Sequence, residues 1–434
     1  MEQQSMCAEG KYMYNLAADL FPICRSIMGE GTRKTLYRLQ QELPQLKLYQ
    51  VPSGTRVFDW TIPKEWNIED AYIEDGNGNK IIDFKKNNLH VVGYSSPIDK
   101  IITFEELQSH LYSLPEQPDW IPYVTSYYKE HWGFCMSHSQ RKNLPLGNYH
   151  VVIKSKLEDG YLTYGELLIP GKSKKEIFLS SYICHPSMAN NELSGPVLLV
   201  KLAQWLLEKK DRYYSYRLIL VPETIGSITY LSLNLPYMKE NIIAGYNITC
   251  VGDDKQVSYV PTRNGNTLSD RAALNILNNY VPNFISYTFL QRGSDERQYN
   301  APGIDLPVCT ICRSKYHEYP EYHTSADNMS FISVEGLQGS FDLYTKIISA
   351  IEENRLYNCN CLCEPQLGKR GLYPTESFKG STNMVKGMMD FLAYTDGTHD
   401  LIEISDIIQV PIMLLVEIAK KLLKVGLVSI VEEG

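Results

Sequence analysis

Long apolar runs are missing from this sequence. A membrane-spanning helix needs about 20 consecutive apolar residues, and no stretch of the 434-residue chain approaches that length. The first residues, MEQQSMCAEGKYMYN, lack the basic start and the apolar core of a secretory signal. We therefore expect a cytoplasmic protein that does not enter a membrane.

Positive charge is scarce as well. The chain has 42 Lys and Arg residues and 50 Asp and Glu residues, so its formal net charge is −8 at pH 7. Domains that bind nucleic acid usually carry a basic patch or a basic stripe along one face. The composition therefore disfavours broad nucleic-acid binding.

The ten cysteines do not form the pairs of a zinc ribbon. Such a site uses two CxxC pairs roughly 15–20 residues apart. Here the pair Cys309 and Cys312 is followed much later by a CxCxC run at 359–363. This pattern is typical of reduced thiols in a cytoplasmic protein.

What the sequence does contain is the pattern of an α/β protein. Apolar β-forming segments alternate with segments of helical periodicity after residue 148. The predicted strands are 149–156, 161–169, 177–182, 216–221 and 245–251, and the predicted helices are 193–209, 272–277 and 331–353. Strands that alternate with helices favour a mixed, mostly parallel sheet with helices on both faces.

Residues 53–125 depart from this pattern. They are punctuated by Pro and Gly and contain short β-like runs, with a hairpin signal, DGNGN, at 75–79. We predict a small β-rich domain inserted into the α/β domain, which then comprises residues 1–52 and 126–365.

Residues 370–434 predict a separate C-terminal domain. Helical periodicity at 384–394, 401–408 and 411–425 is followed by a strand-like run at 427–431, the order of a winged helix. The third helix is apolar and poor in Arg, which is unlike a helix that reads a DNA groove. We favour packing or homo-oligomer formation as its role.

Two segments before residue 150 leave alternatives open. Arg25 lies in a breaker-rich turn, where it could cap a helix or bind an anion, and the cap is favoured. The aromatic run at 127–135, with His131 and His138, could line a substrate pocket or form a packed turn.

Four polar segments carry the chemistry, and the first two directly follow predicted strands. They are HPSMANNELSG at 185–195, PETIG at 222–226, GSDERQ at 293–298 and YHTSAD at 322–327. Because loops at the carboxyl ends of parallel strands share one edge of the sheet, we expect these segments to converge. Histidines and carboxylates on such loops are typical of a catalytic zinc site, where a free carboxylate takes a proton from the zinc-bound water.

These motifs are similar to those of a known superfamily. The segments ICHPSMANNELSG, VPETIGS, GSDERQYNAPGI and EYHTSADN, with PICRSIMGEGTR near the start, resemble the di-zinc aminopeptidases, a superfamily that also contains the glutaminyl cyclases. The resemblance is strongest to a bacterial group of aminopeptidase-like proteins with an inserted β domain and a C-terminal winged helix. It extends over nearly the whole chain and implies a zinc-peptidase fold.

The resemblance also implies roles for single residues. His185 and His323 stand at histidine ligand positions, and Glu223 stands at the position of the general base. Asp295 matches an aspartate that lies beside the site and orients groups near the substrate.

Three carboxylate ligand positions of the superfamily are occupied by Asn191, Thr224 and Thr249. Two closely spaced dications need carboxylates to neutralise and bridge them, so we expect one Zn²⁺ and not two. Two histidines and one oxygen ligand would resemble the mono-zinc carboxypeptidase arrangement. Asn191 is the candidate oxygen ligand by position, and Glu192 or Asp295 could supply the charge instead.

The function expected from the sequence is that of a zinc-dependent aminopeptidase or related amidohydrolase. Glu223 would take the proton of the zinc-bound water and pass it to the leaving amine. Asp295 or Glu296 would hold the substrate α-amino group, and Glu192 and Tyr322 would be further substrate contacts. The expected partner is a small peptide or an amide-bearing small molecule, such as a sugar.

Two alternatives stay open at this point. One is a protein of the same fold that has lost catalysis and binds a peptide or a modified sugar. The other is a regulator that uses the winged helix on nucleic acid.

Overall fold

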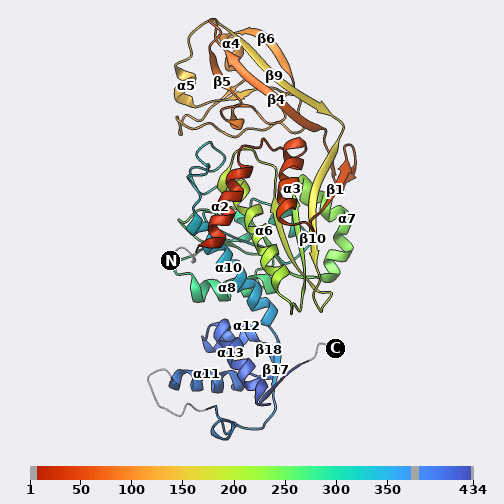
Figure 1. Cartoon of the computed structure of the whole chain (residues 1–434), viewed down its shortest axis with the longest axis vertical. Helices are drawn as coiled ribbons and strands as arrows, with labels where there is room; N and C mark the ends of the chain where they lie inside the picture. Colours follow the sequence, from red (N-terminus) through yellow and green to blue (C-terminus); the bar gives the residue numbers. More distant parts are fainter. Residues whose placement is uncertain (1–6, 373–380, 432–434) are drawn as a thin grey trace. The chain divides into compact units, whose positions relative to one another are not determined.

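The computed structural model describes residues 7–372 and 381–431. The chain divides into two compact units, Met1–Gly265 with Ile285–Asp342, and Asn266–Phe284 with Leu343–Gly434 (Figure 1). Within the described ranges, no helix is both long enough and apolar enough to cross a bilayer. All ten cysteines lie in these ranges, and all are free thiols.

An eight-stranded sheet forms the centre of the first unit, in the order β1-β10-β12-β11-β13-β16-β14-β15. Strands β12, β11, β13 and β16 run parallel, while β1, β10 and β14 join in antiparallel pairs, so the predicted mixed, mostly parallel sheet is confirmed. Every residue of β11 and β12 is buried, as expected for parallel strands covered on both faces. The strands are β1 (Lys47–Pro52), β10 (Tyr161–Ile169), β11 (Glu176–Tyr182), β12 (Ser215–Val221), β13 (Ile242–Asn247), β14 (Ser258–Val260), β15 (Ile285–Ser286) and β16 (Val308–Cys312).

Helices α6 and α7 cover opposite faces of this sheet. Helix α6 leads from β11 to β12, and α7 leads from β12 back across β11 to β13. Since crossovers between parallel strands are right-handed, a reversal of direction places the second helix on the other face. The helices of this unit are α2 (Ala8–Leu20), α3 (Glu30–Glu42), α4 (Phe104–Gln108), α5 (His138–Lys142), α6 (Ser194–Glu208), α7 (Ile225–Asn241), α9 (Glu296–Tyr299) and the first part of α10 (Val334–Glu353).

Gly195 lets the start of α6 approach the sheet closely. A Cβ atom at this position would lie 2.3 Å from the backbone oxygen of Ile248 and 2.4 Å from Oγ of Ser181. Only glycine fits there without a shift of the backbone. The ELSG sequence therefore brings the loop before α6 close to the ends of β11 and β13.

The inserted β-rich part has its own four-stranded sheet, β5-β4-β9-β6. The predicted strand 149–156 is present as β9 (Asn148–Glu158), but it pairs with β4 and β6 instead of the large sheet. Its side chains largely alternate between buried and exposed at its ends, as in an antiparallel sheet with one solvated face. The sheet of the insert thus extends to Glu158, beyond the boundary at 125 suggested by the sequence. The other strands here are β2 (Arg56–Val57), β3 (Trp60–Thr61), β4 (Glu65–Glu74), β5 (Lys80–Asp83), β6 (Ile98–Thr103), β7 (Leu111–Tyr112) and β8 (Phe134–Cys135).

The second unit has the predicted winged-helix order. Three helices, α11 (Ser381–Ala393), α12 (Leu401–Ile408) and α13 (Ile412–Lys424), accompany an antiparallel sheet of β18 (Asp396–Asp400), β17 (Leu356–Cys359) and β19 (Val428–Ile430). The segment between the first two predicted helices of this unit mostly forms strand β18.

Helix α8 (Leu268–Tyr280) was expected in the α/β domain but belongs to this second unit. The amide of Asn275 donates a hydrogen bond to Oγ of Ser405 at 2.8 Å. Arg271 pairs with Asp400 at 2.7 Å. These contacts join α8 to α12, and local periodicity could not reveal them.

Candidate functional site

His185 and Glu223 meet at the carboxyl ends of two parallel strands. His185 follows the end of β11, and Glu223 follows the end of β12. The register pairs Tyr182 with Val221, so the two loops leave the sheet at the same edge. His185 Nε2 and Glu223 Oε2 are 3.6 Å apart. The predicted convergence of the first two polar segments is therefore present.

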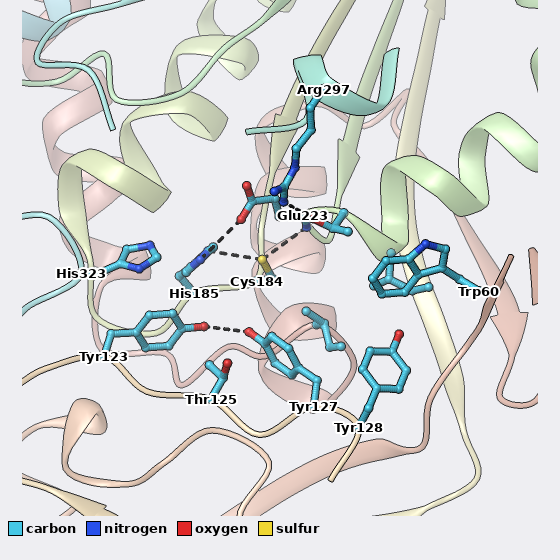
Figure 2. A pocket seen from close by; sticks show the side chains of 13 residues that line it. Trp60, Tyr123, Thr125, Tyr127, Tyr128, Cys184, His185, Glu223, Arg297 and His323 are labelled. Atoms are coloured by element: carbon cyan, nitrogen blue, oxygen red, sulfur yellow. Dashed lines mark hydrogen bonds and ion pairs between the residues drawn. The ribbon is translucent and has the colours of Figure 1, made fainter. Parts of the chain in front are cut away.

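His323 joins them from a distant segment. Its ring centroid lies 5.3 Å from that of His185, and the ring of Tyr123 lies 5.1 Å from both (Figure 2). The backbone N–H of Tyr123 donates to the carbonyl oxygen of His323 at 2.9 Å. The ring of Tyr322 stacks on the ring of His323, with 3.9 Å between the two ring centroids. The chain that leaves the insert thus holds the loop that carries the second histidine.

A buried charged pair orients His185. Its Nδ1 lies 3.0 Å from Oε2 of Glu192, and Arg25 lies 3.5 Å from the other oxygen of the same carboxylate. The side chains of Arg25 and Glu192 are both fully buried. In the ionised form of Glu192, which the charge of Arg25 favours, the carboxylate accepts a hydrogen bond from Nδ1–H of His185 and leaves the lone pair of the ring on Nε2.

Arg25 also ties this pair to the rest of the fold. It donates one hydrogen bond to the carbonyl oxygen of His185 at 2.9 Å and another to that of Leu20 at 2.8 Å. Leu20 is the last residue of α2, so the predicted helix cap is confirmed.

The electrostatics of the site keep both histidines neutral. Burial, with a further effect of Arg25, lowers the pKa of His185 to about 3. Burial, with the neighbouring His185 and His317, lowers the pKa of His323 well below its ordinary value. Neutral imidazole is the form that binds a metal ion.

The pKa values of the acidic residues at the site are raised. Burial raises the pKa of Glu192 to about 8, and Arg25 opposes this shift. Burial and the charge of Asp295 raise the pKa of Glu223 well above its ordinary value. Burial also raises the pKa of Asp295 to about 6. Such shifts make Glu223 a stronger proton acceptor than an exposed glutamate.

Asp327 locks two of the site loops together. Its carboxylate accepts hydrogen bonds from the backbone N–H groups of Ala189, Asn190 and Asn191, and from the hydroxyl of Tyr319. The acceptor comes from the YHTSAD segment and the three amides come from the HPSMANNELSG segment. Two segments more than 130 residues apart are thereby fixed to each other.

Backbone strain is present around the site. Four non-glycine residues beside it have positive φ angles: Ser187 at 44°, Thr224 at 64°, Cys250 at 51° and His323 at 56°. Each such conformation costs energy and persists only where the surroundings enforce it. A π-helical turn at Ala189–Leu193 adds a further irregularity of the kind found at functional sites.

Asn191 and Thr249, which the resemblance matches to carboxylate ligand positions, belong to a neutral hydrogen-bond network. The hydroxyl of Tyr182 donates to Oδ1 of Asn191 at 2.9 Å and lies 2.6 Å from Oγ1 of Thr249. All three side chains are buried. Asn191 does not reach the pocket lining. The side-chain oxygen of Asn191 is thus already used within the protein.

Asp295 and Glu296 lie behind the pocket lining. Oδ1 of Asp295 accepts from the backbone N–H of Thr224 and from Oγ of Ser227, both at 2.8 Å, and its Oδ2 has no hydrogen-bond partner among the described residues. Glu296 accepts from the hydroxyl of Tyr316 at 2.5 Å and from the backbone N–H of Gly293 at 2.8 Å. Asp295 therefore supports the turn after Glu223, while Glu296 and Glu192 are engaged within the protein.

A pocket of about 440 Å³ opens over these residues. Its lining comprises Ile27, Trp60, Tyr123, Thr125, Tyr127, Tyr128, Cys184, His185, Glu223, Thr224, Ile225, Arg297 and His323. Tyr127 and Tyr128 line this pocket, which is one of the two alternatives left open for the aromatic run. His131 does not line it, and instead contacts the hydroxyl of Tyr112 at 2.8 Å.

Sequence reasoning missed several of the lining residues, among them Trp60, Tyr123 and Arg297. Arg297 follows Asp295 and Glu296 in the GSDERQ segment, so that motif could have indicated it. Trp60 and Tyr123 carried no local signal, because both come from the insert and not from the loops of the large sheet.

The site contains side-chain atoms of the kind that bind a cation. Nε2 of His323 is buried and has no hydrogen-bond partner among the described residues, which suits a ligand atom. Among the described residues, the one group of three or more potential ligand atoms within 4.8 Å of one another is formed by Cys184, His185 and Glu192. That group uses Nδ1 of His185 and faces Arg25, whose charge would repel a cation. The space beside Nε2 of His185 is therefore the better candidate position for a metal ion.

The fold is that of the zinc aminopeptidase superfamily, with a C-terminal winged helix. The structure of BSAP, a zinc aminopeptidase from Bacillus subtilis, aligns with 79% of this chain and 95% of its own at a TM-score of 0.57 and 13% identity. At this identity the likeness shows the fold alone.

Two family models place the chain more closely. The model described as a domain of unknown function, DUF4910, matches residues 14–354, and a winged helix-turn-helix model matches residues 355–430. The chain belongs to the DUF4910 family.

Two similar proteins come from Clostridium acetobutylicum. One bears the description “Putative polysaccharide biosynthesis protein with aminopeptidase-like domain” and is 45% identical over 413 residues, which is 93% of this chain and 92% of that protein. The other is a crystal structure described as a “putative peptidase”, with a TM-score of 0.93 and 43% identity over 99% of this chain and 98% of its own.

Proposed function

We propose that this protein is a metal-dependent hydrolase that cleaves an amide bond with Glu223 as the general base. The observation that carries the proposal is the meeting of His185, His323 and Glu223 at the edge of the parallel sheet, beside a pocket. The aminopeptidase-like fold supports it.

We propose His185 and His323 as the protein ligands of a single zinc ion. When bound, the ion would polarise the amide carbonyl and lower the pKa of a water molecule. Asn191 and Glu192 were expected as oxygen ligands. The side-chain oxygen of Asn191 accepts a hydrogen bond from Tyr182, and the carboxylate of Glu192 is paired with Arg25. The neutral network around Asn191 leaves a second dication without the carboxylates that would balance its charge.

Glu223 moves the proton in this mechanism. Its carboxylate takes a proton from the attacking water as the oxygen bonds to the carbonyl carbon. The same proton then passes to the amide nitrogen as the carbon–nitrogen bond breaks. Burial and the neighbouring Asp295 raise the pKa of Glu223, which strengthens it as an acceptor.

The residues behind the pocket hold this arrangement in place. Asp295 accepts from the backbone of Thr224 and so fixes the turn that presents Glu223. Glu192 and Arg25 fix the ring of His185. Positioning of this kind commonly affects metal affinity by 10–100-fold.

The substrate class is a small amide. The description of one relative, which names polysaccharide biosynthesis and an aminopeptidase-like domain, supports an amide-bearing sugar beside a peptide as candidates. We also propose a cytoplasmic location, which the ten free cysteines support.

A second candidate is a binding protein of the same fold that no longer catalyses. The neutral Tyr182–Asn191–Thr249 network favours it, because ligand positions of the superfamily are lost there. This candidate predicts ligand binding without turnover in the unmodified protein.

Glu223→Gln tests the proposal. Release of free amine from N-acetylated sugars, N-acyl amino acids and leucine 4-nitroanilide would be measured with zinc-loaded protein. We expect the variant to keep its zinc and to lose turnover by about 10²–10⁴-fold. Glu240→Gln, at an exposed glutamate in the last turn of α7, is the matched control. Unchanged turnover, or loss of zinc in the Glu223 variant, would contradict the role of Glu223 as base.

A further inference from the structure

The pocket offers little to hold a free amino terminus. Glu223 is the one carboxylate in its lining among the described residues, and the proposed mechanism uses it as the base. Glu192 and Glu296, expected to hold an α-amino group, are buried and paired within the protein. A substrate ammonium needs acceptors, which this lining does not provide beyond the catalytic carboxylate.

The lining does offer a cation. Arg297 is exposed and lines the pocket, and Figure 2 shows its side chain extending from α9 toward Glu223. Its Nη2 donates to Oγ1 of Thr224 at 2.7 Å. No carboxylate of the described residues lies within ion-pair distance of its guanidinium. The hydroxyl of Thr224 thus holds the arginine while leaving other N–H groups for a ligand.

A guanidinium held this way is suited to a negatively charged group. Its planar fork matches the two oxygens of a carboxylate or of a phosphate. A single fixed donor contact to Thr224 reduces the entropy lost on binding, because the side chain is already oriented.

An aromatic pair lies at the same pocket. Trp60 comes from strand β3 and Tyr128 from the segment between β7 and β8, and their ring centroids are 5.8 Å apart at 62°. Trp60 is 40% exposed and Tyr128 is 57% exposed. Accessible aromatic side chains in a pocket indicate a ligand that packs against them. The ring of a ligand is well suited to pack against an aromatic ring.

We propose that the pocket selects a substrate that carries an anionic group beside a ring, and not a free peptide N-terminus. Arg297 is the anion-binding side chain, and Trp60 with Tyr128 forms the wall that contacts the ring. This proposal rests on amide hydrolysis at Glu223 and specifies its substrate class. A carboxylate and a phosphate share the recognising chemistry, so the test includes both.

Binding is measured separately from turnover, in zinc-loaded Glu223→Gln protein by calorimetry. The probes are N-acetylmuramic acid with a carboxylate, N-acetylglucosamine 1-phosphate, neutral N-acetylglucosamine, and L-leucinamide with a free amino group. We expect at least one anionic probe to bind tenfold or more tightly than the neutral probe and than L-leucinamide. Tightest binding of L-leucinamide, or equal binding of all probes, would overturn the proposal.

Substitutions in the same background assign the residues. Arg297→Gln is expected to remove the preference for the anionic probe, and Arg297→Lys to keep part of it. Arg292→Gln is the matched control, because Arg292 is exposed and lies outside the pocket lining. Trp60→Leu is expected to weaken the charged and the neutral sugar probes alike. An unchanged preference in Arg297→Gln would contradict the assignment.

Kinetics of the protein with Glu223 intact separate this proposal from the proposed function. If Arg297 binds the substrate anion, Arg297→Gln raises KM for anionic substrates far more than KM for neutral ones, while the control Arg292→Gln, outside the pocket lining, leaves both unchanged. A uniform fall in kcat would show that Arg297 acts on the reacting carbonyl and would overturn the proposal. Tighter binding of the anionic probes with no turnover of any substrate would contradict the proposed hydrolysis, while it would support Arg297 as the anion-binding side chain.

Discussion

The hydroxyl of Tyr182 donates a hydrogen bond to Oδ1 of Asn191 at 2.9 Å, in a fully buried position at the end of β11. The same hydroxyl lies 2.6 Å from Thr249. Two positions that the sequence resemblance matches to carboxylate ligands are therefore joined by a tyrosine into a network without charge. This network is the structural reason to expect one metal ion in this protein.

Restoring a single carboxylate should not restore a second metal ion. In Asn191→Asp, the new carboxylate still accepts from Tyr182, while Thr249 and Thr224 stay neutral. Elemental analysis should therefore find the same zinc content in the variant as in the unmodified protein. A doubled zinc content would show that Asn191 alone limits the site to one ion.

Loss of Arg25 should destabilise the protein and weaken the metal site. Arg25→Met leaves the buried Glu192 without its partner, which costs about 3–5 kcal/mol of unfolding free energy when one member of a buried pair is removed. Urea unfolding of the full chain measures the loss, and zinc titration measures the affinity.

The double variant Arg25→Met, Glu192→Gln is the control for this prediction. It removes both charges, so part of the lost stability should return. A double variant no more stable than Arg25→Met would show that Arg25 acts through its hydrogen bonds to Leu20 and His185 instead.

The winged-helix unit should lose stability in acid through Asp400. Burial raises the pKa of Asp400, but hydrogen bonds from Arg271 and from the backbone of Glu403 outweigh it, so the pKa is held below its ordinary value. The stabilisation is present above the unfolded pKa of about 3.9 and is lost as pH falls through the lower native pKa.

Hydrogen exchange of the α12 amides measures this effect. Asp400→Asn should lower their protection at pH 7 by about 1–3 kcal/mol, because a hydrogen-bonded charge is lost. The difference in amide protection between Asp400→Asn and the unmodified protein should shrink toward pH 3. Asp390→Asn, in a largely surface pair with Lys386, is the control and should change protection little. An equal difference at pH 7 and pH 3 would contradict a charge effect.

The large sheet and two of the site loops could be predicted from sequence because their signals are local. Apolar runs identified β10, β11 and β12, and a polar residue after a parallel strand falls at a known edge of the sheet. His185 and Glu223 were found this way. The convergence of His323 with them needed the family resemblance, since its loop does not follow a predicted strand directly.

Pairing partners and packing neighbours could not be predicted in the same way. The periodicity of β9 marks a strand, but the choice of β4 and β6 as partners is made by residues about 50–90 positions away. Tyr182 looked like one more apolar residue of β11, so its bond to Asn191 carried no sequence signal. Trp60 reaches the pocket only because the insert folds beside it, which local patterns do not encode.

Metal content of the purified protein tests the central claim most directly. Elemental analysis of the unmodified chain, Glu223→Gln and His323→Ala would be compared at equal protein concentration. We predict about one zinc per chain in the first two and almost none in His323→Ala, as a single site with two histidine ligands requires. No zinc in the unmodified chain, two per chain, or an unchanged content in His323→Ala would contradict it.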